Sequence, residues 1–133
     1  MENLKLIKVL ENLRRIERLI CPILNASGIT LAQMRLMHQI QALEPVASSK
    51  LSDHLGISRA SVTGQIKELE RLGLSESRPH PSDGRSSLIS LSDLGRQRFD
   101  AIVLTLSGLE QQMDSAVLTP LSDSLEQLAG SLA

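Results

Sequence analysis

Apolar residues recur at every third or fourth position over residues 3–24, and most charged residues of this segment fall between them. This spacing predicts a long amphipathic helix with an apolar stripe along one side. Pro22 lies late in the segment and is expected to kink or end the helix, because proline lacks the amide donor that an interior position needs. Residues 25–28 are expected to form a loop.

A capping signal marks the start of the next helix. Thr30 is followed three residues later by Gln33, which predicts a capping box and a helix that begins directly after Thr30. This helix is expected to stop before Pro45. A short helix over residues 49–55 is expected to follow, with Ser48 as its cap.

A second helix is predicted directly after this short one, across a turn at Gly56. Ser58 is a favoured cap for a helix over residues 59–72, and Gly73 stands where a left-handed residue commonly ends a helix. A short helix, a glycine turn and a second helix form the pattern of a helix-turn-helix. That motif places its second helix in the major groove of DNA.

Two short strands, over residues 74–79 and 85–91, are predicted to form a hairpin after the helix pair. Between them, Pro81 fixes its own φ, Asp83 can bond its own backbone, and Gly84 is free to adopt a positive φ. We therefore expect a β-hairpin beside the helix-turn-helix.

Two further helices are expected at the end of the chain. Ser92 is the predicted cap of a long helix that contains Phe99, and Thr119 with Pro120 is predicted to start the last helix, as cap and first helical position. The helix-turn-helix is too small to cover the apolar stripes of the first and last helices. A second copy of the chain is expected to cover them, which predicts a homodimer.

These elements predict a mainly α fold with a small β-hairpin wing, that is, a winged helix-turn-helix with long N- and C-terminal dimerisation helices. The expected boundaries are 1–29 for the N-terminal dimerisation helix, 30–91 for the winged helix-turn-helix DNA-binding domain, and 92–133 for the C-terminal dimerisation helices.

Composition narrows the classes of function. Phe99 is the sole aromatic residue among 133, which argues against folds that stack bases on aromatic platforms. The net charge is −1, with a mildly basic first segment and acidic residues concentrated after residue 86, an asymmetry that can orient a protein on DNA. Cys21 is the single cysteine, so no internal disulfide is possible, and no signal peptide or long apolar run is evident. We expect a cytoplasmic protein that does not contact membranes.

No arrangement of residues with catalytic spacing stands out, so an enzyme is not expected. His38, His54 and His80 fall on three different predicted elements, without the ligand spacing of a metal site. Neither a metal nor a cofactor is therefore predicted.

The second helix of the pair has small and polar residues at its front, whereas Val62, Ile66 and Leu69 mark its buried face. Small side chains allow a helix to approach base edges, and Arg and Gln can make bidentate contacts to guanine and adenine. Lys67 and Arg71 are better placed for phosphates. The predicted DNA contacts of this helix are Ser58, Arg59, Ala60, Ser61, Thr63, Gly64, Gln65, Lys67 and Arg71. The alternative is an ordinary amphipathic helix with a solvated polar face.

Four segments together are similar to one known family: 51–63, 69–74, 78–85 and 89–95. On these residues the chain resembles, from Leu31 through Gly95, the MarR family of winged helix-turn-helix regulators. The more specific parts are the Asp-x-Arg of the wing, at Asp83 and Arg85, and the Leu-Ser-x-x-Gly that ends at Gly95. The terminal helices agree with the family's dimerisation helices in position but share no sharp motif with them.

The resemblance implies a dimer on a pseudo-palindromic DNA site, with each recognition helix in a major groove and each wing in the flanking minor groove. Arg85 would enter the minor groove and Asp83 would orient it by an ion pair. The alternative for these two residues is a turn aspartate and a solvated arginine. The further wing residues expected at the DNA are Arg78, His80 and Ser82.

Two residues of the first wing strand depart from the family pattern. Ser75 and Ser77 stand where the family often has an apolar and a basic residue. We therefore expect a less tightly packed strand and DNA binding that is weak or sensitive to salt.

The signal that controls such a regulator has several candidate residues. Cys21 is a candidate redox sensor, with a buried small hydrophobe as the alternative, because the tyrosines that usually hold such a thiolate in the family are absent. Met34 and Met37 are candidates for the lining of a cavity that takes a small apolar or phenolic effector, with ordinary core packing as the alternative.

The leading functional hypothesis is a dimeric, sequence-specific regulator of transcription that binds double-stranded DNA and acts as a repressor released by a small-molecule or redox signal. One alternative is a winged-helix module that holds another protein without binding DNA. The other is a regulator, such as an activator, that has no ligand pocket.

Overall fold

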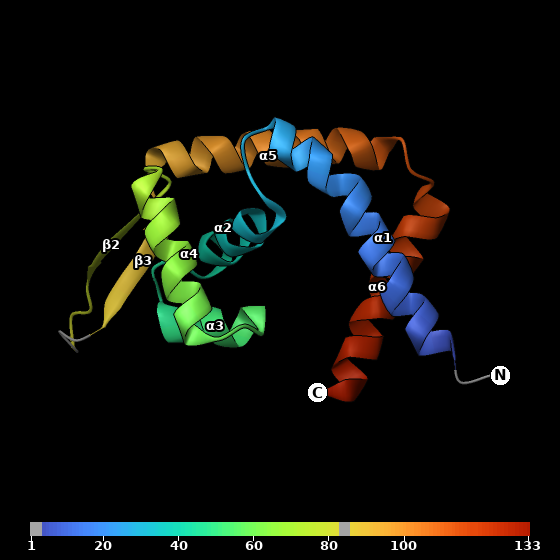
Figure 1. Ribbon diagram of the computed structural model, residues 1–133, viewed down its shortest axis with the longest axis horizontal. Coiled ribbons are helices and arrows are strands. Elements are labelled where there is room, and N and C mark those ends of the chain that lie inside the picture. The colour runs from blue at the N-terminus through green and yellow to red at the C-terminus, as the bar shows by residue number, and fades with distance from the viewer. Residues whose placement is uncertain (1–3, 83–85) are drawn as a thin grey trace. The chain divides into compact units, whose positions relative to one another are not determined.

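Most of the chain is helical in the computed structural model, which describes residues 4–82 and 86–133 (Figure 1). The chain divides into two units, Met1–Phe99 and Asp100–Ala133. The elements in chain order are α1 (Lys5–Ala26), α2 (Leu31–Leu43), β1 (Val46–Ala47), α3 (Ser48–Leu55), α4 (Arg59–Arg71), β2 (Ser75–Pro79), β3 (Ser87–Leu91), α5 (Asp93–Gln111) and α6 (Ser115–Leu132). The predicted fold class, mainly α with a small β wing, is confirmed.

Helix α1 ends two residues later than predicted, because it continues through Pro22 to Ala26. A proline inside a helix removes one hydrogen bond. Here the turn that follows is held by burial, since the side chain of Leu24 is 1% exposed. Gly28, with φ of 80°, and the buried Ile29 then lead into α2.

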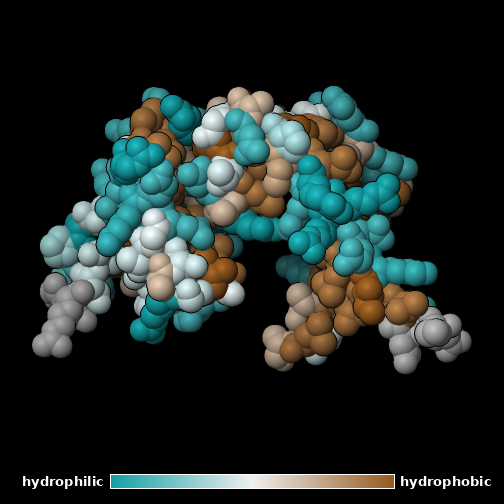
Figure 2. Space-filling view, viewed as in Figure 1, coloured by the Kyte–Doolittle hydropathy of each residue, from teal (hydrophilic) through white to brown (hydrophobic). Residues whose placement is uncertain are grey.

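Much of the apolar stripe of α1 lies at the surface. Ile7, Leu10 and Ile16 of this stripe are 53%, 57% and 42% exposed, and apolar surface is visible along this helix in Figure 2. Among the described residues, no single helix combines the length and the apolarity that a membrane crossing requires; α1 and α2 taken together meet both criteria, with a bend of 82° between them.

The capping predictions for α2 and α4 are confirmed, and the one for α3 is wrong. Thr30 and Gln33 form a complete capping box, with reciprocal hydrogen bonds of 3.0 and 3.1 Å. Ser58 caps α4 by accepting a hydrogen bond from the Ser61 amide. Ser48, in contrast, is the first residue of α3, and Ala47 occupies the cap position without a side-chain bond. Ala47, the last residue of β1, has the extended backbone of a cap position, with φ of −76° and ψ of 148°, so the helix begins one residue earlier than predicted.

The wing is a three-stranded antiparallel sheet in the order β1-β3-β2, rather than the two-stranded hairpin that was predicted. Strand β1 pairs Val46 with Ile89, and β2 pairs Ser75 with Leu91. The sequence did not indicate β1, because a two-residue strand has no alternation to detect. One face of β3 packs into the core, with Ile89 and Leu91 at 2% and 1% exposure.

Helix α5 begins directly against the wing. The Ser92 hydroxyl caps the helix by accepting a hydrogen bond from the Gly95 amide at 3.0 Å, as predicted, and it donates one to the Gly73 carbonyl at 2.6 Å. Gly95 allows a close approach, because a Cβ there would lie 1.9 Å from the carbonyl oxygen of Leu74. The helix start is therefore fixed to the strand that follows α4.

The second unit contains the end of α5 and all of α6. The prediction that Thr119 and Pro120 start the last helix is wrong: α6 begins at Ser115, and the Asp114 side chain caps it by accepting a hydrogen bond from the Ala116 amide at 2.9 Å. A helix started by this cap places Pro120 in its interior. Large apolar residues are exposed here as well, with Leu104 at 75%.

Candidate nucleic-acid interface

Helix α4 is held by one apolar face, which leaves its opposite face outward. Val62, Ile66 and Leu69 are 0%, 7% and 0% exposed, as the sequence predicted. The turn that precedes α4 is fixed by Gly56 with φ of 66° and by a 2.7 Å hydrogen bond from the Ser52 hydroxyl to the Ile57 carbonyl. The buried face and the preceding turn thus fix the position of α4 against the rest of the first unit.

Most of the predicted contact residues of α4 lie at the surface, and one does not. The exposed ones are Ser58, Arg59, Ala60, Ser61, Thr63, Gly64, Lys67 and Arg71. Gln65 is half-buried and lines a cavity of about 180 Å³ that Arg35 of α2 also lines. Helical spacing places Ala60, Gly64 and Arg71 opposite the buried face. Along the centre of the outward surface, the first two residues therefore have small side chains and the third, near the end of the helix, has a positively charged one.

Arg71 is engaged within its own helix by Glu68, a residue that the sequence analysis did not consider. Its Nε and NH2 groups donate to the two Glu68 carboxylate oxygens at 3.0 and 2.5 Å. The hydrogen bond from Arg71 lowers the pKa of Glu68 below its ordinary value, and the same bond raises the pKa of Arg71. Both groups are therefore charged at neutral pH. The spacing of three residues on a helix is the signal that predicts such a pair.

A cavity of about 240 Å³ separates the second half of α4 from the sheet. Thr63 and Lys67 line it from the helix, and Ser77 and Ile89 line it from the strands. Two of the predicted DNA contacts, Thr63 and Lys67, therefore lie beside a hollow whose lining is partly polar and partly apolar.

The tip of the wing is only partly described. Asp83 and Arg85, the residues expected at the minor groove, lie outside the described residues. His80 fixes the backbone just before the tip, because its Nδ1 accepts a hydrogen bond from the Ser82 amide at 3.1 Å. Arg78 is exposed on β2.

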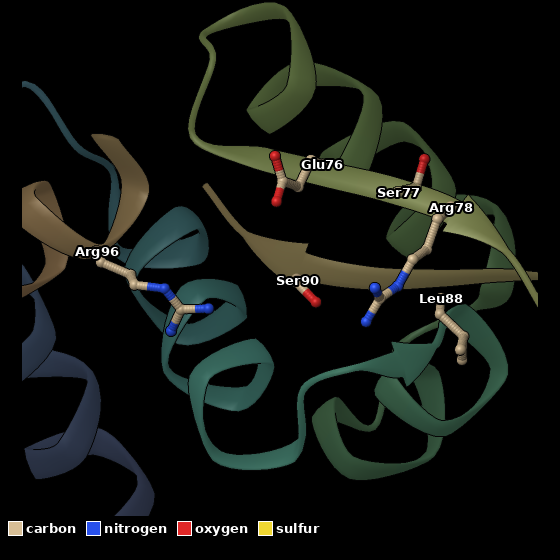
Figure 3. A pocket seen from close by; sticks show the side chains of 6 residues that line it. All are labelled: Glu76, Ser77, Arg78, Leu88, Ser90 and Arg96. Atoms are coloured by element: carbon tan, nitrogen blue, oxygen red, sulfur yellow. The ribbon is translucent and has the colours of Figure 1, made fainter. Parts of the chain in front are cut away.

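The outer face of the sheet carries another cavity, of about 320 Å³ and mainly polar in its lining, which is shown in Figure 3. Arg78 of β2 and Arg96 of α5 both line it. Arg96 is in addition ion-paired with Glu44, and the Glu44 carboxylate accepts a hydrogen bond from the Leu91 amide at 2.9 Å. Neither Glu44 nor Arg96 stands out in the sequence, because the partners of both side chains are distant along the chain.

The three candidate signal residues occupy different environments. Cys21 is a half-buried free thiol on α1, and Met37 is fully buried in the core. Met34 lines a cavity of about 270 Å³ between α2 and α3, together with His38 and His54. Within residues 4–82 and 86–133, no group of three or more His, Cys, Asp or Glu side chains is arranged to hold a metal ion.

The chain has the fold of a winged helix-turn-helix protein: α3 and α4 form the helix pair, and the three-stranded sheet forms the wing. Residues 29–87 match the model of the MarR family. The chain is 31% identical over 75 residues to YdgJ, an HTH-type transcriptional regulator of Bacillus subtilis (strain 168). This match covers 56% of the chain and 46% of YdgJ, so the chain spans about half the length of that curated relative.

The same fold occurs in solved structures. AbsC, a MarR family transcriptional regulator from Streptomyces coelicolor, matches with a TM-score of 0.81 and 19% identity, over 98% of this chain and 93% of AbsC. A MarR mutant from E. coli complexed with operator DNA matches with a TM-score of 0.80 and 20% identity, over 96% of this chain and 95% of that one. Residues 29–87 are therefore similar to the MarR family of regulators, and the chain has the fold of solved MarR-family structures.

Proposed function

We propose that this protein is a sequence-specific transcriptional regulator that binds double-stranded DNA as a homodimer on a pseudo-palindromic operator. The observation that supports this most directly is the outward face of α4, where small and polar side chains are exposed opposite Val62, Ile66 and Leu69. A solved structure of the same fold, the E. coli MarR mutant, is a complex with operator DNA.

The proposed contacts follow from the geometry of α4. Ser58, Arg59 and Ser61 lie at its N-terminal end, the part of a recognition helix that contacts base edges in the major groove. Lys67 lies two turns later and is assigned to the phosphate backbone. Arg85 of the wing is assigned to the minor groove on the strength of the family motif alone.

Dimerisation is proposed from the exposed apolar residues of both units. Leu10 and Leu19 of α1 and Val117 and Leu132 of α6 are 57%, 69%, 61% and 72% exposed. Exposed apolar residues in this number along terminal helices are typical of an obligate interface. Two subunits would place their recognition helices about one helical turn of DNA apart.

We further propose that the dimer acts in the cytoplasm as a repressor and that a signal releases it from DNA. Two observations each support one signal. The cavity beside Met34 is of a size for a small apolar or phenolic effector. The half-buried thiol of Cys21 supports release by oxidation.

Binding-site selection from random duplexes with the purified protein tests the proposed function. Enrichment of a two-fold-symmetric site is expected. Arg59→Ala is expected to weaken binding to that site by about tenfold or more, since a bidentate base contact is lost. The matched control is Arg98→Ala, which removes an exposed arginine of α5 outside the proposed interface. A protein that selects no duplex contradicts the proposal and favours the protein-binding alternative.

Oligomeric state is tested by light scattering on the eluting protein. A dimer is expected at micromolar concentration, and Leu10→Lys or Val117→Lys is expected to shift it to monomer, since either change places a charge on an exposed apolar face. A wild-type protein that is monomeric at this concentration refutes the dimer.

The two signals are separated by one pair of variants. If oxidation releases the DNA, peroxide weakens binding of the wild type and leaves Cys21→Ser unaffected. If a cavity ligand does so, phenolic compounds weaken binding of the wild type and have less effect on Met34→Ala. The absence of any response in both arms supports a regulator without a release signal.

A further inference from the structure

A negatively charged residue lies beside the outward face of α4, where it would repel the phosphates of DNA. Within this helix, Glu68 and Glu70 are the acidic residues. Glu70 lines the cavity between α4 and the sheet. Glu68 instead follows Gly64 by four residues, which places it beside the outward stripe of Ala60, Gly64 and Arg71.

Glu68 already holds Arg71, one of the two cations of α4 that are predicted to contact phosphate. The two bonds from Arg71 to its carboxylate, of 3.0 and 2.5 Å, use one edge of the guanidinium group, formed by Nε and Nη2. A phosphate would accept bonds from the same donors. Phosphate and carboxylate therefore compete for Arg71.

Building on the proposed function, we propose that Glu68 restrains the DNA affinity of the recognition helix by holding Arg71 in an internal ion pair. The pair is exposed, with side-chain exposures of 67% and 45%, so it is weak and a phosphate can displace Glu68. The displaced carboxylate then remains beside the phosphate without a cation. When Arg71 stays on Glu68, the DNA complex lacks the contact of this arginine to phosphate. When Arg71 binds phosphate, the Glu68 carboxylate has lost its ion pair.

The restraint acts on the part of the binding energy that is independent of sequence. Contacts to phosphates position a protein on DNA but do not distinguish bases. Glu68 therefore lowers the affinity for operator and random duplexes by the same factor and leaves the preference between them to the residues at the front of α4. Such a restraint raises the fraction of regulator that is free of DNA and leaves the ratio of operator to non-specific affinity unchanged.

The experiment compares Glu68→Gln, Arg71→Ala and the double variant in duplex-binding titrations at several salt concentrations. Glu68→Gln is expected to tighten binding about fivefold per subunit at low salt, the factor for no longer having to break the ion pair of Glu68 with Arg71, two unit charges at contact distance in water. Its dependence on salt is expected to steepen by about 0.9 in the logarithmic slope per subunit, because one more phosphate is neutralised. The double variant is expected to bind like Arg71→Ala.

Glu110→Gln is the control for net charge, since Glu110 is exposed on α5 in the second unit. Equal gains for Glu68→Gln and Glu110→Gln would overturn the proposal, as would a gain for Glu68→Gln that survives Arg71→Ala or appears only on the operator. These outcomes leave the proposed function intact when the wild type binds its site and Arg59→Ala does not. A wild type that binds no duplex overturns both.

Discussion

Glu44 joins three elements at the base of the wing, and its removal is expected to destabilise the protein. In the register of β1 and β3, where Val46 pairs with Ile89, residue 44 falls opposite residue 91. The backbone amide of Glu44 is used to end α2 on the Ile40 carbonyl. The position opposite Leu91 is filled by the Glu44 side chain, whose carboxylate accepts a hydrogen bond from the Leu91 amide at 2.9 Å and forms an ion pair with Arg96.

The magnitude follows from the burial of the partners. Leu91 is 1% exposed, so Glu44→Ala leaves its buried amide without this acceptor, at a cost of about 1.5–3 kcal/mol in the free energy of unfolding. The ion pair adds less, about 0.5 kcal/mol, because the side chain of Arg96 is 45% exposed. We expect Glu44→Ala to lose about 2–3 kcal/mol in all and Glu44→Gln, which keeps an acceptor, to lose less than about 1 kcal/mol.

Urea unfolding followed by far-ultraviolet circular dichroism is the suitable assay, because the chain has no Trp or Tyr for fluorescence. Protein concentration is held constant, since a dimer's stability depends on it. Glu17→Ala is the matched control: it breaks an ion pair with Arg35 in which both side chains are half exposed, and should cost less than about 1 kcal/mol. Equal losses for Glu44→Ala and Glu44→Gln would refute the dominance of the hydrogen bond.

Three further substitutions test individual positions. Ser75→Ala is expected to raise the free energy of unfolding by about 1 kcal/mol, because the buried Ser75 hydroxyl has no hydrogen-bond partner among the described residues; a drop in the urea midpoint would contradict this. Gly64→Ala is expected to stabilise α4 by about 0.5–1 kcal/mol, since nothing lies within 4 Å of a Cβ there, yet to weaken duplex binding. Thermal unfolding and titration on the same preparation check both effects, and unchanged affinity would place Gly64 away from DNA. Gly95→Ala is expected to cost about 2 kcal/mol or more, because the new Cβ would clash with the Leu74 carbonyl, and wild-type stability would show that α5 can shift.

Local signals predicted most of the helices correctly. The capping box at Thr30 and Gln33 and the cap at Ser58 involve residues three apart, so the sequence contains the whole interaction. The start of α6 was misassigned because Asp114 and Thr119 are both plausible caps. Sequence alone does not rank two competing caps five residues apart.

The candidate site was predicted in part. Eight of the nine α4 residues assigned to DNA are exposed, because a clear apolar face at Val62, Ile66 and Leu69 defines its opposite. Gln65 lies at the edge of that face, where burial depends on the neighbouring helices. Glu68 has the spacing of a helical ion pair with Arg71, a signal that is present in the sequence.

The sequence by itself determined the succession of helices, the outward face of α4 and the resemblance of residues 29–87 to the MarR family. Caps and apolar periodicity operate within a few residues of each other, so a single sequence contains them. Tertiary structure alone decided the third strand of the wing and the environment of Glu44, whose partner Leu91 is 47 residues away. Strand pairing and buried hydrogen bonds depend on which distant groups the fold brings together. A single sequence does not record that proximity.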